Sequence, residues 1–195
     1  MTDGLPTSPA ADTGRLTLEW LNLEFASICN LRCKWCSLDH DKPKQFMSRE
    51  LLAKVLDDVI ADPGIRLDRI ELHNAGETLL HPDLPGMFAE IAQRKARLPR
   101  INLLTNAGPL NQARTAAILG SGAIDDIRFS VDGGTRELFE DLRRPAKWAS
   151  IRANIHTFLD ANAAAPRRLR TGIICIVDPS RPLTTMRERS STCRW

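Results

Sequence analysis

The sequence predicts an α/β fold of about five parallel strands with helices outside. Three observations support this: short runs rich in Ile, Val and Leu alternate with helical patterns, each run ends at Gly, Asn or Asp, and the 195 residues are 43% hydrophobic. Strands that alternate with helices are typical of parallel βαβ units. They fit either an open doubly wound sheet or part of a (β/α) barrel.

The expected strands are short and bounded by turn-forming residues. They span residues 16–26, 69–75, 101–106, 124–132 and 171–178. Between them, apolar residues recur at 3.6-residue spacing, which predicts amphipathic helices. Capping residues or apolar stripes mark where these helices are expected to begin: Ser48, Asp83, Asn111, Thr135 and Trp148. The first helix should end at Pro63–Gly64, because proline and glycine interrupt helices.

The length allows one domain. We expect its core over residues 15–178, a disordered tail over residues 1–14 and an irregular, basic tail over residues 179–195. The expected core stops directly after a strand, which leaves that strand with an uncovered edge or face. The sequence therefore predicts an incomplete barrel, either a truncated domain or one that needs a partner.

Composition argues against two classes of protein. The formal net charge is only +3 and basic residues are mixed with acidic ones, so no specific nucleic-acid partner is expected. No run of about 18 apolar residues occurs, and residues 1–14 lack the features of a signal peptide. We therefore expect a cytoplasmic protein without a membrane span.

Polar and Gly-rich segments follow the predicted strands. In chain order they are CNLRCKWC, HNAGET, LLTNAG, FSVDGG and VDPSR. In parallel α/β folds the carboxyl ends of the strands share one edge, and ligands bind there. We expect these five segments to converge on one site.

Three of the five cysteines lie in the first of these segments, at Cys29, Cys33 and Cys36. In a reducing compartment, clustered thiols indicate metal or cluster binding rather than disulfides. A [4Fe–4S] cluster is usually held by four thiolates, so three would leave one iron open. Structural zinc is the rival interpretation, because His40 could complete a Cys3His site. Thiols that bind nothing are a further alternative.

The segment CNLRCKWC resembles the CxxxCxxC motif of the radical S-adenosylmethionine (SAM) enzymes. Ala75-Gly76-Glu77 resembles that family's GGE-like motif, and Thr105-Asn106-Ala107 resembles its TNG-like motif. Ser130 and Asp132 match the serine and aspartate of the fourth strand. The order and spacing agree over about residues 16–178, and the sequence is most similar to the subgroup with a SPASM or twitch extension. Here, however, five βα units are expected where the family has six, and no extension with clustered cysteines follows.

The resemblance implies a role for each matching residue. Cys29, Cys33 and Cys36 would bind three irons of a [4Fe–4S] cluster, and SAM would chelate the fourth through its amino and carboxylate groups. The residues expected to bind SAM are Trp35, Ala75, Gly76, Glu77, Asn106, Ser130, Asp132 and Arg143, with Arg144 as an alternative to Arg143. Alanine in place of glycine at positions 75 and 107 is expected to be tolerated where the backbone angle permits it.

The resemblance also implies reductive cleavage of SAM to a 5′-deoxyadenosyl radical, which abstracts hydrogen from a substrate. An external reductant such as flavodoxin or ferredoxin would supply the electron. Related enzymes modify peptides, sugars, nucleosides and cofactor precursors, so the substrate stays open. Two other functions are alternatives: a non-catalytic Cys3His zinc or redox module, and a nucleotide-binding α/β domain. The sequence has no GxGxxG or Walker-type loop, which disfavours the last.

Overall fold

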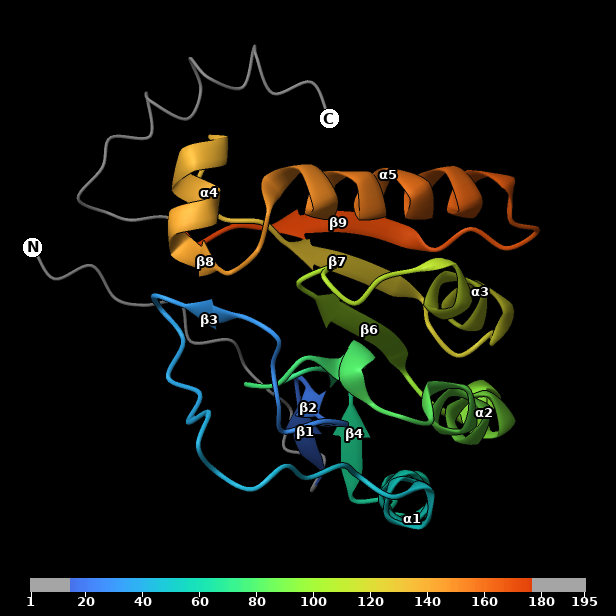
Figure 1. Ribbon diagram of the computed structural model, residues 1–195. Coiled ribbons are helices and arrows are strands. Elements are labelled where there is room, and N and C mark those ends of the chain that lie inside the picture. The colour runs from blue at the N-terminus through green and yellow to red at the C-terminus, as the bar shows by residue number, and fades with distance from the viewer. Residues whose placement is uncertain (1–14, 177–195) are drawn as a thin grey trace, which may run out of the picture.

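The computed structural model describes residues 15–176, and at its centre is a sheet of five strands (Figure 1). The strands follow the order β2-β5-β6-β7-β9, and every pairing is parallel. Their bounds are Leu21–Asn22 (β2), Arg69–Leu72 (β5), Arg100–Thr105 (β6), Asp126–Ser130 (β7) and Arg170–Ile174 (β9). The prediction of about five parallel strands with helices outside is confirmed, and the curved sheet forms a partial barrel.

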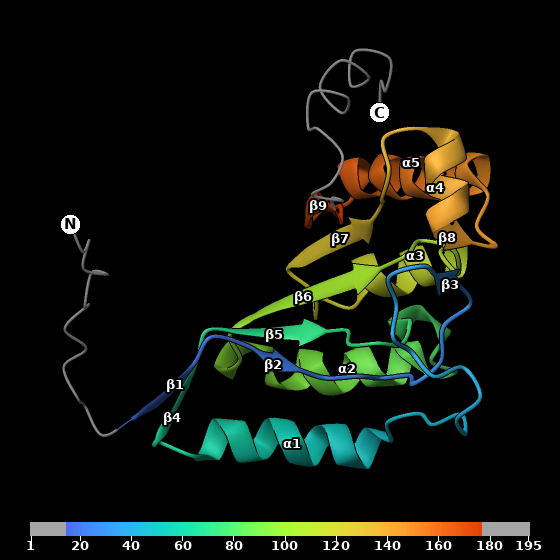
Figure 2. The same cartoon turned by 90° about the vertical axis from the view of Figure 1, so that its left-hand side faces the viewer.

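Four helices lie along one side of this sheet (Figures 1 and 2). They are α1 (Arg49–Ala61), α2 (Leu84–Arg94), α3 (Gln112–Gly120) and α5 (Trp148–Ala164), while α4 (Arg136–Leu142) lies at the end of β7. The predicted N-caps of α1 to α4 each accept a hydrogen bond from a backbone N–H of the first turn: Ser48, Asp83, Asn111 and Thr135. Short 3₁₀ turns follow at η1 (Thr78–Leu80) and η2 (Lys95–Arg97).

The two faces of the sheet differ in polarity, because successive side chains of a strand point to opposite faces. The side chains that join the helices in the core are apolar and fully buried: Ile70, Leu72, Ile101, Leu103 and Ile127. Those between them in the sequence are mostly polar, among them Glu71, Asn102, Asp126 and Arg128. A parallel sheet that is packed on both faces is apolar on both. The polar face is therefore the concave one that a ligand can reach.

One predicted strand is wrong as a single element. The segment 16–26 forms β1 (Leu16–Leu18) and then β2, and β1 pairs with β4 (Ile65–Leu67) in a separate parallel pair. The polypeptide bends directly after each of these two strands, where the Asp68 N–H donates to the Leu18 carbonyl at 3.0 Å. Figure 2 shows the pair turned away from the main sheet. An alternating sequence pattern does not reveal such a bend.

A second, unpredicted pairing joins distant parts of the chain. β3 (Arg32–Cys33) pairs antiparallel with β8 (Arg143–Arg144), which places Cys33 opposite Arg143. The Lys34 N–H also donates to the Leu142 carbonyl at 2.9 Å. Two-residue strands have no sequence signature, so this contact was beyond the reach of pattern analysis. It fastens the cysteine segment to the end of α4.

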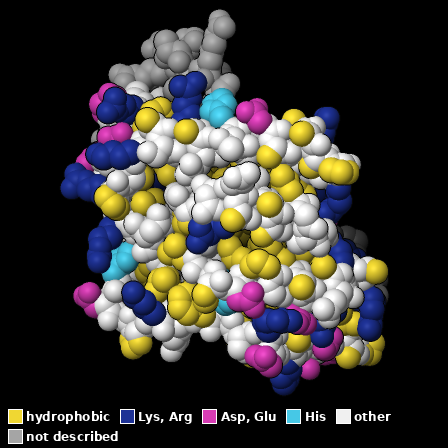
Figure 3. Space-filling model, turned by 45° about the vertical axis from the view of Figure 1, so that its right-hand side comes forward, with side chains coloured by type: hydrophobic (Ala, Val, Ile, Leu, Met, Phe, Trp, Pro, Cys, Tyr) yellow, Lys and Arg dark blue, Asp and Glu magenta, His cyan; other side chains and the backbone are white. Residues whose placement is uncertain are grey.

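The last described strand, β9, is an edge strand of the sheet. Two apolar side chains are exposed at this edge: Ile173 in β9 is 47% exposed, and Ile176, just after β9, is 49% exposed. The expected tails, 1–14 and 179–195, lie outside the described residues. Within residues 15–176 no helix is long and apolar enough to cross a membrane. On the face seen in Figure 3, basic and acidic side chains are interspersed rather than gathered into one patch.

Candidate functional site

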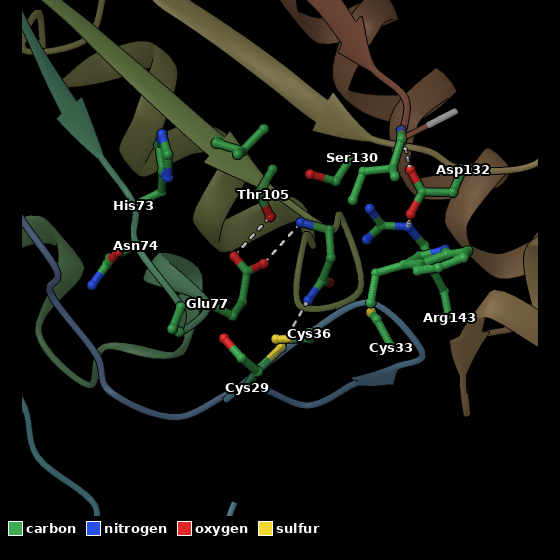
Figure 4. Close-up of a pocket in the computed structure, with 17 residues that line it drawn as sticks. Cys29, Cys33, Cys36, His73, Asn74, Glu77, Thr105, Ser130, Asp132 and Arg143 are labelled. Atoms are coloured by element: carbon green, nitrogen blue, oxygen red, sulfur yellow. Dashed lines mark hydrogen bonds and ion pairs between the residues drawn. The ribbon is translucent and has the colours of Figure 1, made fainter. Parts of the chain in front are cut away.

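A cavity of about 390 Å³ opens at the carboxyl ends of β5, β6 and β7. Most of its lining comes from the first four segments that were expected to converge, and the fifth, VDPSR, lies outside the described residues (Figure 4). Apart from the alternatives His40 and Arg144, the residues expected to bind the cluster or SAM all line it: Cys29, Cys33, Trp35, Cys36, Ala75, Gly76, Glu77, Asn106, Ser130, Asp132 and Arg143. Sequence reasoning did not assign a role there to Ser37, His73, Asn74, Leu104, Thr105 or Ile176, which complete the wall.

The cysteine segment forms one side of this cavity. Backbone N–H groups donate to two of its sulfurs, from Leu31 to Cys29 Sγ and from Leu38 to Cys36 Sγ, both at 3.4 Å. The two donors are buried leucines of the same loop, so the turns that place the sulfurs are anchored in the core. The loop is therefore shaped to present its thiols to one space.

The Ala75–Glu77 loop lies against the cysteine segment. A Cβ at Gly76 would meet the Ala26 carbonyl oxygen at 1.8 Å, so only glycine fits there. The Glu24 carboxylate accepts from the N–H groups of Ala75 at 3.0 Å and Gly76 at 2.8 Å. Sequence reasoning missed Glu24. Its signal was a carboxylate between the apolar Leu23 and Phe25 of an alternating segment, which places it on the opposite face.

Glu77 links this loop to the end of β6. Its carboxylate accepts from the Leu79 N–H at 3.1 Å, the Thr105 hydroxyl at 2.8 Å and the Asn106 N–H at 2.8 Å. Only 3% of the residue is exposed. Burial raises the pKa of the Glu77 carboxyl, while these three hydrogen bonds oppose the shift. The Glu77 N–H donates to the Ile28 carbonyl at 2.7 Å, so one residue ties three segments of the wall together.

Asn106 stands beside the first cysteine. Its amide nitrogen lies 3.6 Å from Cys29 Sγ and donates to Asn30 Oδ1 at 2.9 Å. The next residue, Ala107, has φ of 59°, the left-handed region that disfavours alanine. The sequence predicted that alanine would be tolerated at positions 75 and 107 where the backbone angle permits it. At Ala107 the φ angle is one that favours glycine. Ala75 has no such strain, because Ala107 is the one non-glycine residue of the described chain with positive φ.

An ion pair forms the opposite wall. Arg143 Nε lies 2.8 Å from Asp132 Oδ2, and both side chains are at least nine-tenths buried. The N–H is not aligned with that oxygen, so the contact is an ion pair rather than a directed hydrogen bond. Asp132 Oδ1 accepts from the Ile176 N–H at 2.8 Å. The alternative residue, Arg144, pairs with Asp141 and is exposed, and it does not line the cavity.

The rest of the wall is polar and partly open. Trp35 lies between two of the cysteines in the sequence and is 52% exposed. Ser130 ends β7, and His73 and Asn74 follow β5. His73 Nε2 lies 3.6 Å from Glu71 Oε2, and burial lowers the pKa of the His73 imidazole. The imidazole is therefore mostly neutral at pH 7.

A model of the radical SAM superfamily matches residues 23–176. The chain belongs to this superfamily. The match spans β2 to the end of β9 and includes the whole cavity wall. Members of the superfamily are enzymes whose cofactors are a [4Fe–4S] cluster and SAM, and they need a reductant and a substrate.

Curated relatives include two proteins named GTP 3',8-cyclase. That of Chlorobaculum tepidum is 29% identical over 69% of this chain and 39% of the relative, and that of Desulforamulus reducens is 27% identical over 76% and 45%. A protein of Pyrococcus furiosus that modifies the cofactor of tungsten-containing aldehyde ferredoxin oxidoreductase is 30% identical over 59% of this chain and 31% of its own. The chain thus spans less than half the length of these relatives.

Solved structures share the radical SAM fold. Native anSMEcpe with bound AdoMet superposes with a TM-score of 0.68 over 89% of this chain and 48% of that chain, at 17% identity. Streptococcus suis SuiB bound to the precursor peptide SuiA gives a TM-score of 0.67 over 89% and 36%, at 15% identity.

The residues present fit a [4Fe–4S] cluster better than a single zinc ion. Tetrahedral zinc with bonds of about 2.3 Å needs its sulfurs roughly 4 Å apart. Among residues 15–176, no group of three or more His, Cys, Asp or Glu side chains is arranged to hold one metal ion. His40, the fourth ligand of the zinc alternative, does not line the cavity. A wider cluster suits three thiols that face a common space of this volume.

The surroundings of two of the thiols disfavour their charged form. Desolvation raises the pKa of the Cys29 thiol to about 11, and the nearby carboxylate of Glu77 adds to the effect. Desolvation also raises the pKa of Cys33, while Arg143 opposes the shift. Thiols in such surroundings are protonated at pH 7 unless a cation is bound, because a metal centre stabilises the thiolate.

Proposed function

We propose that this chain binds a [4Fe–4S] cluster through Cys29, Cys33 and Cys36 and binds SAM in the adjoining cavity, where it cleaves SAM reductively. One observation carries the proposal. The three cysteines share a single cavity with the segments that match the family's other motifs. When bound, the two groups supply one-electron cleavage of a carbon–sulfur bond and abstraction of a hydrogen atom from a substrate.

The protein's own residues hold the site in place. Glu24 and Glu77 fix the Ala75–Glu77 loop against the cysteine segment, and the β3–β8 pair holds Cys33 beside Arg143. We assign that loop, with Asn106 and Ser130, to the methionine and ribose parts of SAM.

The remaining predicted residues complete this assignment. Trp35 is assigned to the adenine, because its ring is exposed at the cavity wall. The Arg143–Asp132 pair is assigned to the methionine carboxylate. Arg143 would then share its guanidinium between two carboxylates, which its five donors permit.

The zinc alternative and the nucleotide-binding alternative are supported by no arrangement in the described residues. Names of relatives mention GTP, and one structural neighbour is bound to a peptide. We propose flavodoxin or ferredoxin as reductant, a cytoplasmic location, and residues 15–178 as the catalytic core.

The test is anaerobic reconstitution with iron and sulfide, followed by SAM and dithionite. Wild-type protein is expected to bind about four irons and four sulfides and to release 5′-deoxyadenosine. The triple variant Cys29→Ala, Cys33→Ala, Cys36→Ala should lose both. Cys175→Ala is the matched control, because this half-buried thiol does not line the cavity. A colourless wild-type protein with one zinc and no sulfide would favour the zinc module instead.

A further inference from the structure

The concave face of the sheet is built from side-chain rows that run across four strands in register. Of two successive rows, the one farther from the cysteines, the far row, consists of Glu71, Asn102, Asp126 and Arg170. The next row, two residues further along each strand, consists of His73, Leu104, Arg128 and Gly172. His73 and Leu104 line the cavity, and Arg128 and Gly172 continue their row on the concave face just outside the cavity wall.

The far row is closed by its own contacts. Glu71 accepts from Arg69 at 2.8 Å and from Asn102 Nδ2 at 2.9 Å. Asp126 pairs with Arg100 and with Arg170. Glu71, Asn102 and Asp126 are each less than 9% exposed. The two carboxylates of this row are therefore already paired with arginines.

The second row has an unmatched charge. Arg128 is exposed, and within residues 15–176 its guanidinium has no hydrogen bond or ion pair. The pKa of the His73 imidazole is lowered by burial, and the positive charge of Arg128 adds to this effect. The nearby acids are already engaged, Asp132 with Arg143 and Glu71 with Arg69. Beside it stands Gly172, where a Cβ would meet nothing within 4 Å except Arg128 Cγ at 3.8 Å.

We infer that Arg128 anchors an anionic group of the substrate, a phosphate or a carboxylate, on the concave face beside the inner end of the cavity. Gly172 leaves room for that group, and the neutral imidazole of His73 offers a hydrogen bond from across the row. A guanidinium recognises either anion through paired N–H donors. The inference rests on the proposed function for its meaning, since the anion belongs to the molecule that loses hydrogen.

The test measures anion binding without turnover. Inorganic pyrophosphate and glutarate are titrated by calorimetry into anaerobically purified, reconstituted full chain with SAM but no reductant. We expect one of them to bind, at least tenfold more weakly to Arg128→Gln. Arg168→Gln, which removes another exposed arginine in the loop before β9, is the matched control and should bind within twofold of wild type.

A second variant guards against a folding defect. Gly172→Glu places a carboxylate beside Arg128 without removing it, and we expect the same tenfold loss while circular dichroism stays unchanged. Binding of pyrophosphate alone indicates a phosphorylated substrate, and binding of glutarate alone a carboxylate one. Binding of neither, or binding that Arg128→Gln leaves unchanged, overturns the inference. Release of 5′-deoxyadenosine by a protein that binds neither anion would overturn it while leaving the proposed function standing.

Discussion

Replacement of Gly76 by alanine should destabilise the protein severely. The added Cβ would lie 1.8 Å from the Ala26 carbonyl oxygen, whereas real Cβ contacts essentially never fall below 3.0 Å. The two backbones must therefore separate by about 1.2 Å. Both partners are backbone, so no flexible side chain can absorb the clash.

The cost follows from the hydrogen bonds that this separation stretches. Glu24 accepts from Ala75 and Gly76, and the Glu77 N–H donates to Ile28 at 2.7 Å. Bonds to a charged group contribute about 1.5–3 kcal/mol each and a neutral one about 1 kcal/mol. With partial relaxation we expect a loss of roughly 3–5 kcal/mol, against a total stability of about 5–15 kcal/mol.

Urea denaturation followed by circular dichroism measures this loss. With a slope of about 2 kcal/mol per molar urea, the midpoint should fall by roughly 1.5–2.5 M, and complete loss of the cooperative transition is the extreme form of the same outcome. Gly120→Ala is the control, because position 120 ends α3 and a Cβ there meets nothing within 4 Å. It should be neutral or slightly stabilising. A Gly76→Ala variant within about 1 kcal/mol of wild type would refute the close-approach argument.

Three further outcomes are expected. Glu77→Gln should lower the free energy of unfolding by about 1–3 kcal/mol in urea titrations, because one buried N–H donor then faces an amide NH₂. The lowered pKa of His73 means that the unfolded chain binds the proton more tightly. The contribution of neutral His73 to stability is therefore present above about pH 6.5 and is lost as pH falls through the lower folded-state pKa. The urea midpoint of His73→Asn should therefore drop less than that of wild type between pH 7.5 and pH 5.5. An equal drop in the two proteins would contradict this. Ala107→Val should lower the thermal midpoint by several degrees, because a β-branched side chain at φ of 59° is strained, whereas Ala107→Gly should leave it nearly unchanged.

Much of this site could be predicted because a parallel sheet imposes a simple rule. The carboxyl ends of its strands meet at one edge, so motifs far apart in the sequence converge once the strands are found. Local signals also sufficed for the helix starts, since a cap such as Ser48 or Asn111 acts within its own first turn. These inferences needed only periodicity and chain order.

The missed features depend on contacts between distant segments. The β3–β8 pair joins residues more than a hundred positions apart through strands of two residues. Glu24 holds the Ala75–Glu77 loop from the segment after β2, which pattern analysis took to be part of one strand over residues 16–26. Pairings of this kind are decided by which backbone groups are left without partners after the main sheet forms.

The distribution of charge in the cavity connects its two ends. Asp132 and Arg143 neutralise each other, Glu77 is buried among donors, and among residues 15–176 Arg143 is the cation that opposes the raised pKa of Cys33. The cysteine end therefore favours a ligand that brings its own positive charge, as an iron–sulfur centre or a sulfonium does. Beside the inner end, and among the described residues, the unmatched charge is the cation Arg128, which favours an anion. On the proposed function, we expect a substrate beside SAM to turn its anionic group toward Arg128, because the cation at the cysteine end, Arg143, is already paired with Asp132 and assigned to the carboxylate of SAM.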